Sequence, residues 1–263
     1  MKFKNKVVLF TLICFIVMAT CYFSVKKNNF LVYLKFQPPT NTEEITKKMT
    51  TQKAKDDYDF SNPVPMSDAV FDSYFDDAVF FGDSLTYGMT ANFPIDSDNV
   101  IACKGASIRT MMQKVELSGK EEMGTVNAIG EVVDREPKKI YIMLGINGLA
   151  WMTTQQVIDD YEELIDRIRI ANPYAKIYMQ SIFPVSKFKE QSDDRYNNYK
   201  IDKINNALLN LASEKQVYFL DTNSILKDEK GNLSSEFTNA SDGIHINQEA
   251  YELWYEYLCE HTA

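Results

Sequence analysis

Short apolar runs alternate with longer amphipathic segments from Met66 to the end of the chain, and this alternation predicts the fold. The runs cover residues 78–81, 100–102, 140–144, 177–182 and 217–220. They are rich in β-branched and aromatic residues and apolar on both faces, which is typical of central strands in a parallel sheet. The segments between and after them predict helices at about 107–116, 124–135, 154–171, 196–214 and 247–260. Strands alternating with helices indicate a three-layer α/β sandwich, which binds ligands at the carboxyl ends of its strands.

The chain before Met66 has a different character. Val7 to Val25 is an unbroken uncharged stretch, just long enough to span a bilayer as a helix. An uncleaved membrane anchor is the favoured interpretation. A signal peptide cleaved near Ala19–Cys21, or a lipoprotein attached at Cys21, stays open as an alternative. The lysines that precede the stretch favour an inside N-terminus, although Lys26 and Lys27 oppose it. We therefore expect a single-pass protein of the cell membrane whose main domain is extracytoplasmic.

Three regions follow from these patterns. Residues 1–27 form the predicted signal-anchor, and residues 28–65, with prolines at 38, 39, 63 and 65, form a predicted linker or stalk. Residues 66–263 have a length that suits one globular domain rather than two.

The charge of the chain is uneven, and this narrows the choice of partners. Five of the 28 basic residues lie among the first 27 positions, which hold no acid, so the 37 acidic residues outnumber the basic residues of the remainder by 14. Such an acidic domain is not expected to bind nucleic acid, because it cannot neutralise phosphates broadly. Nothing in the sequence indicates an obligate protein partner.

Cysteine use is compatible with an outside domain. Cys103 and Cys259 are the pair available to that domain. A disulfide between them and two buried free thiols are both consistent with the sequence.

Candidate chemistry appears where the predicted strands end. Ser84 follows the first strand in the segment Gly82-Asp83-Ser84-Leu85, on a turn that leads into a helix. A serine placed there is exposed near a helix N-terminus, which favours a developing anion, so it is a candidate nucleophile. The alternative is that Ser84 only caps the helix.

The second and third strands are followed by groups that could bind an oxyanion. Gly105 permits close approach of its backbone N–H to a ligand, and Asn147 offers a side-chain N–H. Each residue alone could equally serve its own turn.

The two histidines are more informative. His245 stands three residues after Asp242, so one tight turn could bring the carboxylate to the imidazole. A serine nucleophile needs such a base, together with an acid that orients it. His261 is the third residue from the C-terminus and is expected to fray.

Other chemistries lack their motifs. No phosphate-binding loop, dinucleotide fingerprint or HExxH zinc motif is present, and no metal or organic cofactor is expected. Acidic pairs such as Asp76-Asp77 are expected on solvated surfaces.

Four segments together, taken in order, resemble the SGNH hydrolases, the superfamily of GDSL-type esterases and lipases. They are Gly82-Asp83-Ser84-Leu85, Gly105, Gly145-x-Asn147 and Asp242-x-x-His245. The resemblance covers about residues 66–263 and implies a flavodoxin-like three-layer α/β/α sandwich with a five-stranded parallel sheet. It implies that Ser84 is the nucleophile, His245 the base and Asp242 the orienting acid. It also implies an oxyanion hole made by Ser84, Gly105 and Asn147.

The resemblance further implies a carboxylic ester hydrolase that acts on acylated small molecules or glycans. With the predicted outside location, we expect removal of short acyl groups, above all acetyl, from carbohydrate. Tyr87, Leu149 and Trp151 follow the motif residues and are candidates for substrate binding. The family's third motif often continues with Asp where this chain has Gly148, which leaves transfer to a wall polymer as an alternative to hydrolysis. A lipase or lysophospholipase-type activity and a non-catalytic scaffold are further alternatives.

Overall fold

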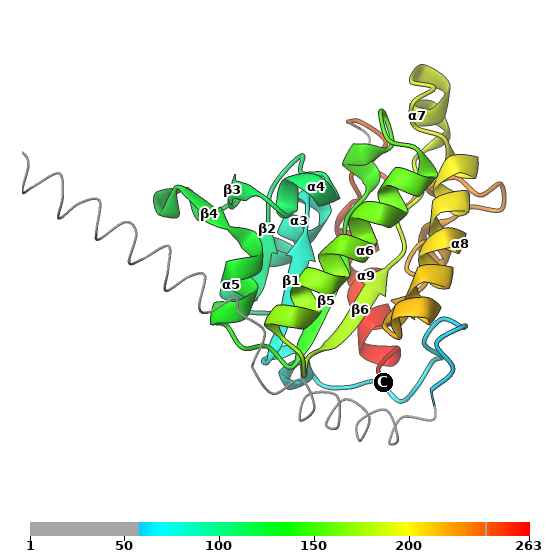
Figure 1. The fold of residues 1–263 in the computed structure, drawn as a ribbon. Helices are drawn as coiled ribbons and strands as arrows, with labels where there is room; N and C mark the ends of the chain where they lie inside the picture. Colours follow the sequence, from blue (N-terminus) through cyan, green and yellow to red (C-terminus); the bar gives the residue numbers. More distant parts are fainter. Residues whose placement is uncertain (1–57, 240) are drawn as a thin grey trace, which may run out of the picture. The chain divides into compact units, whose positions relative to one another are not determined.

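The main sheet lies at the centre of the computed structural model, which describes residues 58–239 and 241–263 (Figure 1). Its five strands are all parallel and follow the order β2-β1-β5-β6-β7. They are β1 (Ala78–Gly82), β2 (Val100–Ala102), β5 (Lys139–Met143), β6 (Lys176–Gln180) and β7 (Tyr218–Leu220). Each predicted apolar run thus supplies one strand of this sheet.

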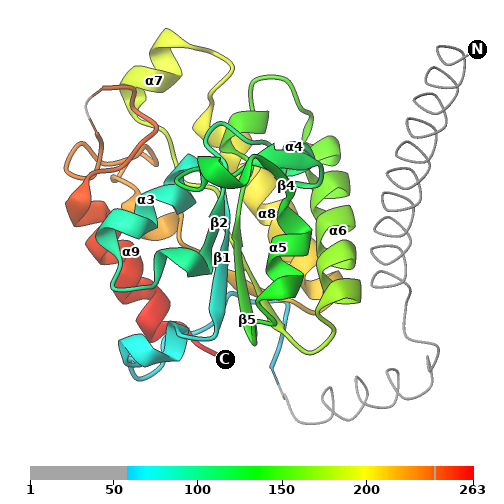
Figure 2. The ribbon, with the colours of Figure 1, turned by 90° about the vertical axis from the view of Figure 1, so that its left-hand side faces the viewer.

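Helices cover both faces of the sheet, as Figure 2 shows. One layer contains α3 (Ser84–Asn92) and α9 (Gln248–Glu260), and the other contains α5 (Ala128–Asp134), α6 (Thr154–Ala171) and α8 (Asn198–Lys215). The short helices α4 (Ile108–Met111) and α7 (Lys187–Ser192) complete the α-helices of the described residues. The predicted α/β/α sandwich is confirmed.

The strand order brings three strand ends together. β1 is the topological switch point of the sheet, because the next strand along the chain, β2, lies on one side of it and β5 lies on the other. Gly82 at the end of β1 is in register with Ala102 of β2 and Met143 of β5. The segments that follow these three strands therefore start at the same end of the sheet, the carboxyl end of its strands. Sandwiches of this kind bind ligands there.

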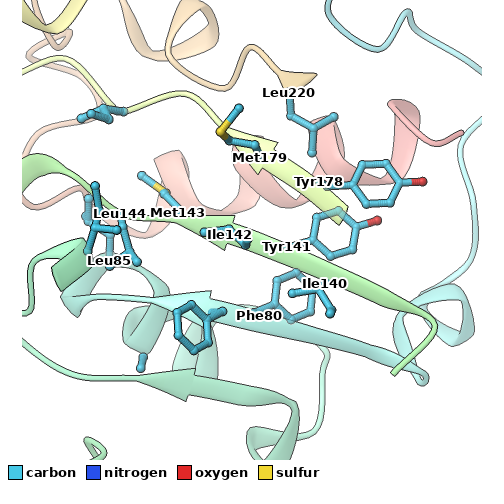
Figure 3. Close-up of a cluster of buried hydrophobic side chains, with 14 of the residues drawn as sticks. Phe80, Leu85, Ile140, Tyr141, Ile142, Met143, Leu144, Tyr178, Met179 and Leu220 are labelled. Atoms are coloured by element: carbon cyan, nitrogen blue, oxygen red, sulfur yellow. The ribbon is translucent and has the colours of Figure 1, made fainter. Parts of the chain in front are cut away.

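Aromatic rings fix the register of the sheet from within. Phe80, Tyr141, Tyr178 and Tyr218 are paired across neighbouring strands and stack in a row, with ring centroids 5.1, 4.6 and 5.0 Å apart. The close-up in Figure 3 shows three of these rings side by side. Shifting one strand by a residue would turn its ring to the other face, so the row favours one register.

The region between β2 and β5 corrects the predicted helices at 107–116 and 124–135. The first helix ends at Met111 and the second begins only at Ala128. Between them β3 (Lys114–Glu116) pairs antiparallel with β4 (Thr125–Asn127). Val115 is buried between two exposed neighbours, which is the period of a strand rather than of a helix. The prediction was wrong because so short an alternation is easily taken for part of a helical face.

Residues 58–65, the described part of the predicted linker, pack against the edge strand β7. The backbone N–H of Val64 donates to the Phe219 carbonyl at 2.8 Å, and the rings of Tyr58 and Phe60 lie against that of Tyr218. Val64 is buried. Contacts of the domain therefore begin before Met66, where composition placed its boundary.

The predicted anchor Val7–Val25 lies outside the residues that the structure describes. Within the described residues, no helix is both long enough and apolar enough to cross a membrane.

Candidate active site

Ser84 is the first residue of α3, directly after β1. The cap of this helix is Asp83, whose Oδ1 accepts the backbone N–H of Leu85 at 3.0 Å. Ser84 is therefore not the cap, and its hydroxyl is available for another partner. Glycine at position 82 lets β1 lie close to β5 just before this turn, because a Cβ there would be 2.4 Å from the Met143 carbonyl oxygen.

His245 reaches the serine from a segment far along the chain. Its Nε2 lies 2.9 Å from Ser84 Oγ, and its Nδ1 lies 2.5 Å from Asp242 Oδ2. The other oxygen of Asp242 accepts the backbone N–H groups of Ile244 and His245, both at 2.9 Å. Gly243, with a φ of 71°, makes the tight turn between the acid and the imidazole. The structure thus brings together the three residues that the sequence proposed as a catalytic triad.

The environment of Asp242 keeps it ionised. Partial burial raises the pKa of Asp242, but donation from the backbone of His245 and Ile244 and from the imidazole outweighs it, so the pKa lies below the usual value. An ionised carboxylate is the form that accepts the Nδ1 proton and leaves Nε2 facing the serine as a proton acceptor.

The three residues predicted to form the oxyanion hole all line one cavity, but their N–H groups differ in whether they already have an acceptor. The backbone N–H of Ser84 is at the start of a helix, where such groups lack an intrahelical partner. Gly105 follows β2 with a φ of 75°. Asn147 lies in a 3-10 turn (Ile146–Gly148) after β5, and its Nδ2 donates at 3.1 Å to both Asp83 Oδ2 and the Ala106 carbonyl. Both amide hydrogens of Asn147 are thus engaged in this structure.

Asp83 is a buried carboxyl group behind the site that the sequence did not single out. It is 1% exposed, and this burial raises the pKa of Asp83 to about 7, against the lowering effects of the Leu85 N–H, His245 and Asn147. In the sequence it stood within the Gly82-Asp83-Ser84-Leu85 motif, but no role was predicted for it, and Ser84 was the candidate for the helix cap instead.

A cavity of about 440 Å³ opens over these groups. It is lined by Ser84, Gly88, Lys104, Gly105, Asn147, Asn239, His245, Ile246 and Tyr251. Five of these residues were not predicted from the sequence: Gly88, Lys104, Asn239, Ile246 and Tyr251. Tyr251 had no signal of its own, because it occupies an ordinary core position of α9, and only packing brings its hydroxyl within 2.9 Å of the Leu85 carbonyl.

The three predicted substrate-binding residues lie outside this lining. Leu149 is buried at 1% exposure, and its carbonyl accepts Lys200 Nζ. Tyr87 is half-buried beneath the ammonium group of Lys104. Trp151 is 60% exposed, with its indole N–H donating to the Asn147 carbonyl at 3.2 Å. The structure therefore places Tyr87 and Trp151 beside residues of the cavity wall and turns Leu149 into the core.

The two cysteines and the second histidine that the sequence singled out occupy structural positions. Cys103 and Cys259 are both free, so no disulfide joins them. His261 does not fray: it is 9% exposed, its Nδ1 lies 2.8 Å from the Tyr257 carbonyl oxygen, and its ring stacks on that of Tyr257. Among residues 58–239 and 241–263, no cluster of His, Cys, Asp and Glu could hold a metal ion.

Known structures share this fold at low sequence identity. A protein from Streptococcus pneumonia, provisionally described as a platelet activating factor, is 20% identical with a TM-score of 0.55, covering 88% of this chain and 97% of that one. A GDSL-like lipase from Bacteroides thetaiotaomicron is 16% identical with a TM-score of 0.52, covering 81% and 94%. A lipase/acylhydrolase from Enterococcus faecalis is 16% identical with a TM-score of 0.50, covering 69% and 92%. No curated protein sequence matches the chain.

A family model extends the likeness from fold to sequence. The model of the GDSL-like Lipase/Acylhydrolase family matches residues 80–253, a span that begins in β1 and ends within α9. It includes Ser84, Gly105, Asn147, Asp242 and His245. The chain therefore belongs to the GDSL-like Lipase/Acylhydrolase family and is an ester hydrolase of the GDSL type.

Proposed function

We propose that the protein is a serine esterase in which Ser84 attacks the ester carbonyl while His245 takes its proton and Asp242 holds the imidazole. One observation carries the proposal: Ser84 Oγ, His245 and Asp242 form a continuous chain of contacts of 2.9 and 2.5 Å beside an open cavity. Proton transfer to a positioned imidazole is what makes a serine hydroxyl nucleophilic at neutral pH.

The oxyanion formed in this attack would be stabilised by the backbone N–H groups of Ser84 and Gly105 and by Asn147. Since both amide hydrogens of Asn147 are engaged, its donation to the oxyanion replaces its bond to the neutral Ala106 carbonyl. The exchange is favourable because a charged acceptor forms the stronger hydrogen bond. The bond to Asp83 meanwhile keeps the amide oriented.

The second half of the reaction releases the acyl group from Ser84. His245 has by then given its first proton to the departing alcohol, so it can take a proton from a water molecule that attacks the acyl-enzyme. That proton passes to Ser84 Oγ as the carboxylic acid leaves. Every step uses side chains and backbone groups of this chain.

For the substrate we propose short acyl esters, above all acetyl, on carbohydrate. Two features support this. The predicted anchor at Val7–Val25 would place the domain outside the cell, where acylated glycans are abundant. The exposed ring of Trp151, fixed by its bond to the Asn147 carbonyl, offers a flat apolar surface next to the site on which a sugar could stack.

Hydrolysis of 4-nitrophenyl acetate and butyrate by the full-length protein in a non-ester detergent tests this function. We expect turnover with a preference for acetate, and a fall of at least about a thousandfold in kcat for Ser84→Ala. Ser192→Ala, which changes an exposed serine on α7, is the matched control and should retain activity.

Wild-type activity that survives in Ser84→Ala would refute the nucleophile assignment. A preference for butyrate would refute the proposed preference for acetyl while leaving the mechanism in place. Adding acetylated and unacetylated oligosaccharides to the same assay separates hydrolysis, which releases acetate, from transfer, which moves it to the added sugar.

A further inference from the structure

Lys104 places a positive charge in the wall of the cavity. Of the described residues that line it, Lys104 is the only one with a permanently charged side chain. It directly precedes Gly105, one of the proposed oxyanion donors. The wall of the cavity that contains Ser84 therefore includes a lysine.

The backbone and side chain of Lys104 are both held in place. Its backbone N–H donates to Ser118 Oγ at 2.9 Å. Its Nζ lies 4.2 Å from the centre of the Tyr87 ring, a cation–π contact that positions the ammonium group without neutralising it. Tyr87 is in turn backed by Gly119, where a Cβ would come within 2.9 Å of the ring.

The charge of Lys104 is not cancelled by an ion pair. Several other lysines have one: Lys120 pairs with Asp98, Lys215 with Glu162 and Asp166, and Lys227 with Asp202. Among the described residues, no carboxylate lies within ion-pair distance of Lys104. Glu121 feels its charge only at longer range, as a minor contribution to the lowered pKa of that residue. The ammonium group is therefore available to a ligand.

This position contrasts with the charge of the rest of the domain. Outside the first 27 residues, acidic residues exceed basic ones by 14, so the overall field repels anions. A cation in the cavity wall that has no ion pair among the described residues opposes that field locally. We propose that Lys104 selects esters that carry an anionic group, a carboxylate or a phosphate, next to the scissile bond. The inference rests on the proposed esterase function and adds the charge class of the substrate.

Matched pairs of esters test this selection in the full-length protein at low ionic strength. 4-Acetoxybenzoate against its methyl ester places a carboxylate on the alcohol side of the bond. Mono(4-nitrophenyl) succinate against its methyl ester places one on the acyl side. 4-Acetoxyphenyl phosphate against phenyl acetate tests a phosphate. In each pair the measured quantity is the ratio of kcat/KM for the anionic ester to that for the neutral one.

We expect at least one pair to show a ratio about fivefold higher in the wild type than in Lys104→Met, the size of one partly solvated charge contact. Lys104→Arg should retain most of the preference, and 0.5 M NaCl should reduce it, at a Debye length of roughly 4 Å. Lys114→Met removes the same charge from an exposed position on β3 and should leave the ratio unchanged.

The outcomes separate this inference from the function on which it rests. Turnover of the neutral esters with equal ratios in wild type and Lys104→Met for all three pairs would overturn the role of Lys104 and leave the esterase in place. A loss of preference in Lys114→Met as large as in Lys104→Met would also overturn it, because the effect would then be one of net charge. Absence of turnover for every ester would overturn both.

Discussion

The carboxyl group of Asp83 is shut away from solvent directly behind the residues proposed to do the chemistry. It binds the backbone that starts α3 with one oxygen and the side chain of Asn147 with the other. Burying an isolated carboxylate has a large desolvation free energy, and two hydrogen-bond donors offset only part of it. Asp83 therefore orients Asn147 and the start of α3 but lowers the free energy of unfolding, by an amount that depends on pH.

The pH dependence of Asp83 has a definite sign. Because burial raises its pKa from 3.8 to about 7, between these values the folded state retains a proton that the unfolded state has released. The contribution of Asp83 to the free energy of unfolding is thus greatest below pH 4 and falls as the pH rises to 7, by about 1.4 kcal/mol per pH unit at most. Asp83→Asn removes this titration.

Urea unfolding of wild type and Asp83→Asn at several values between pH 5 and pH 8 measures the effect. We expect the difference in unfolding free energy, wild type minus variant, to decrease between pH 5 and 7 and to level off above. A difference that stays constant across this range would show that Asp83 titrates normally.

Single residues differ in how far their positions follow from sequence. Ser84 and Asn147 could be placed because each follows a recognisable strand, and His245 because the alternative histidine is terminal. Asp83 and Tyr251 could not, since their contacts with Asn147 and Leu85 depend on how α3, α9 and the turn after β5 pack. Leu149 shows the same limit: proximity in sequence to Asn147 does not decide the direction of a side chain.

At the scale of elements, the site depends on the close approach of α3 to α9. Gly88 in α3 faces Tyr251 in α9, and a Cβ at Gly88 would come within 1.9 Å of the tyrosine oxygen. The Tyr251 hydroxyl is fixed by its bond to the Leu85 carbonyl, so it has little room to yield. Both residues line the cavity, and the packing of the two helices therefore sets its width.

Gly88→Ala should separate the two helices. We expect a loss of about 1–3 kcal/mol in unfolding free energy, typical of overpacking, together with reduced kcat/KM for 4-nitrophenyl acetate. Gly130→Ala in α5 is the control, because a Cβ there would be 3.6 Å from its nearest neighbour and alanine favours a helix. Equal effects of the two substitutions would contradict the close approach as the cause.

How well a helix or strand could be predicted depended on the length of its hydrophobic pattern. Helix α6 begins and ends where the sequence placed it, because Val157, Leu164 and Ile168 mark a continuous buried face and the Thr153–Gln156 capping box fixes the start. The β3–β4 pair was missed because three-residue strands carry too little periodicity to compete with a helical interpretation.

At the scale of the whole molecule, the segment that leads into the domain protects the sheet. β7 is an edge strand, and residues 58–65 cover it through Val64, Tyr58 and Phe60. An uncovered edge exposes hydrogen-bonding groups that can pair with another copy of the chain.

A chain that begins at Met66 should therefore be less stable and more prone to self-association than one that begins at Ala54. Loss of the buried Val64 and the two rings should cost at least about 2 kcal/mol, or roughly 5 °C in Tm for a domain of this size. Thermal unfolding and size-exclusion chromatography of the two chains measure this. Identical Tm values and elution would show that the segment is dispensable.

The C-terminus lies near the start of β6, and Tyr58 and Phe60 lie near the start of β7, so both are at the end of the sheet opposite the cavity. Ala263 binds Lys176 and Tyr178 through its carbonyl oxygen, and Ser67 and Val70 donate to the end of α9 (Figure 1). Tyr58, where the described residues begin, and Ala263 thus both lie away from the mouth of the active site. Immobilisation on a solid support, or fusion to a carrier protein, through Ala263 should leave that mouth open to substrates as large as a polysaccharide.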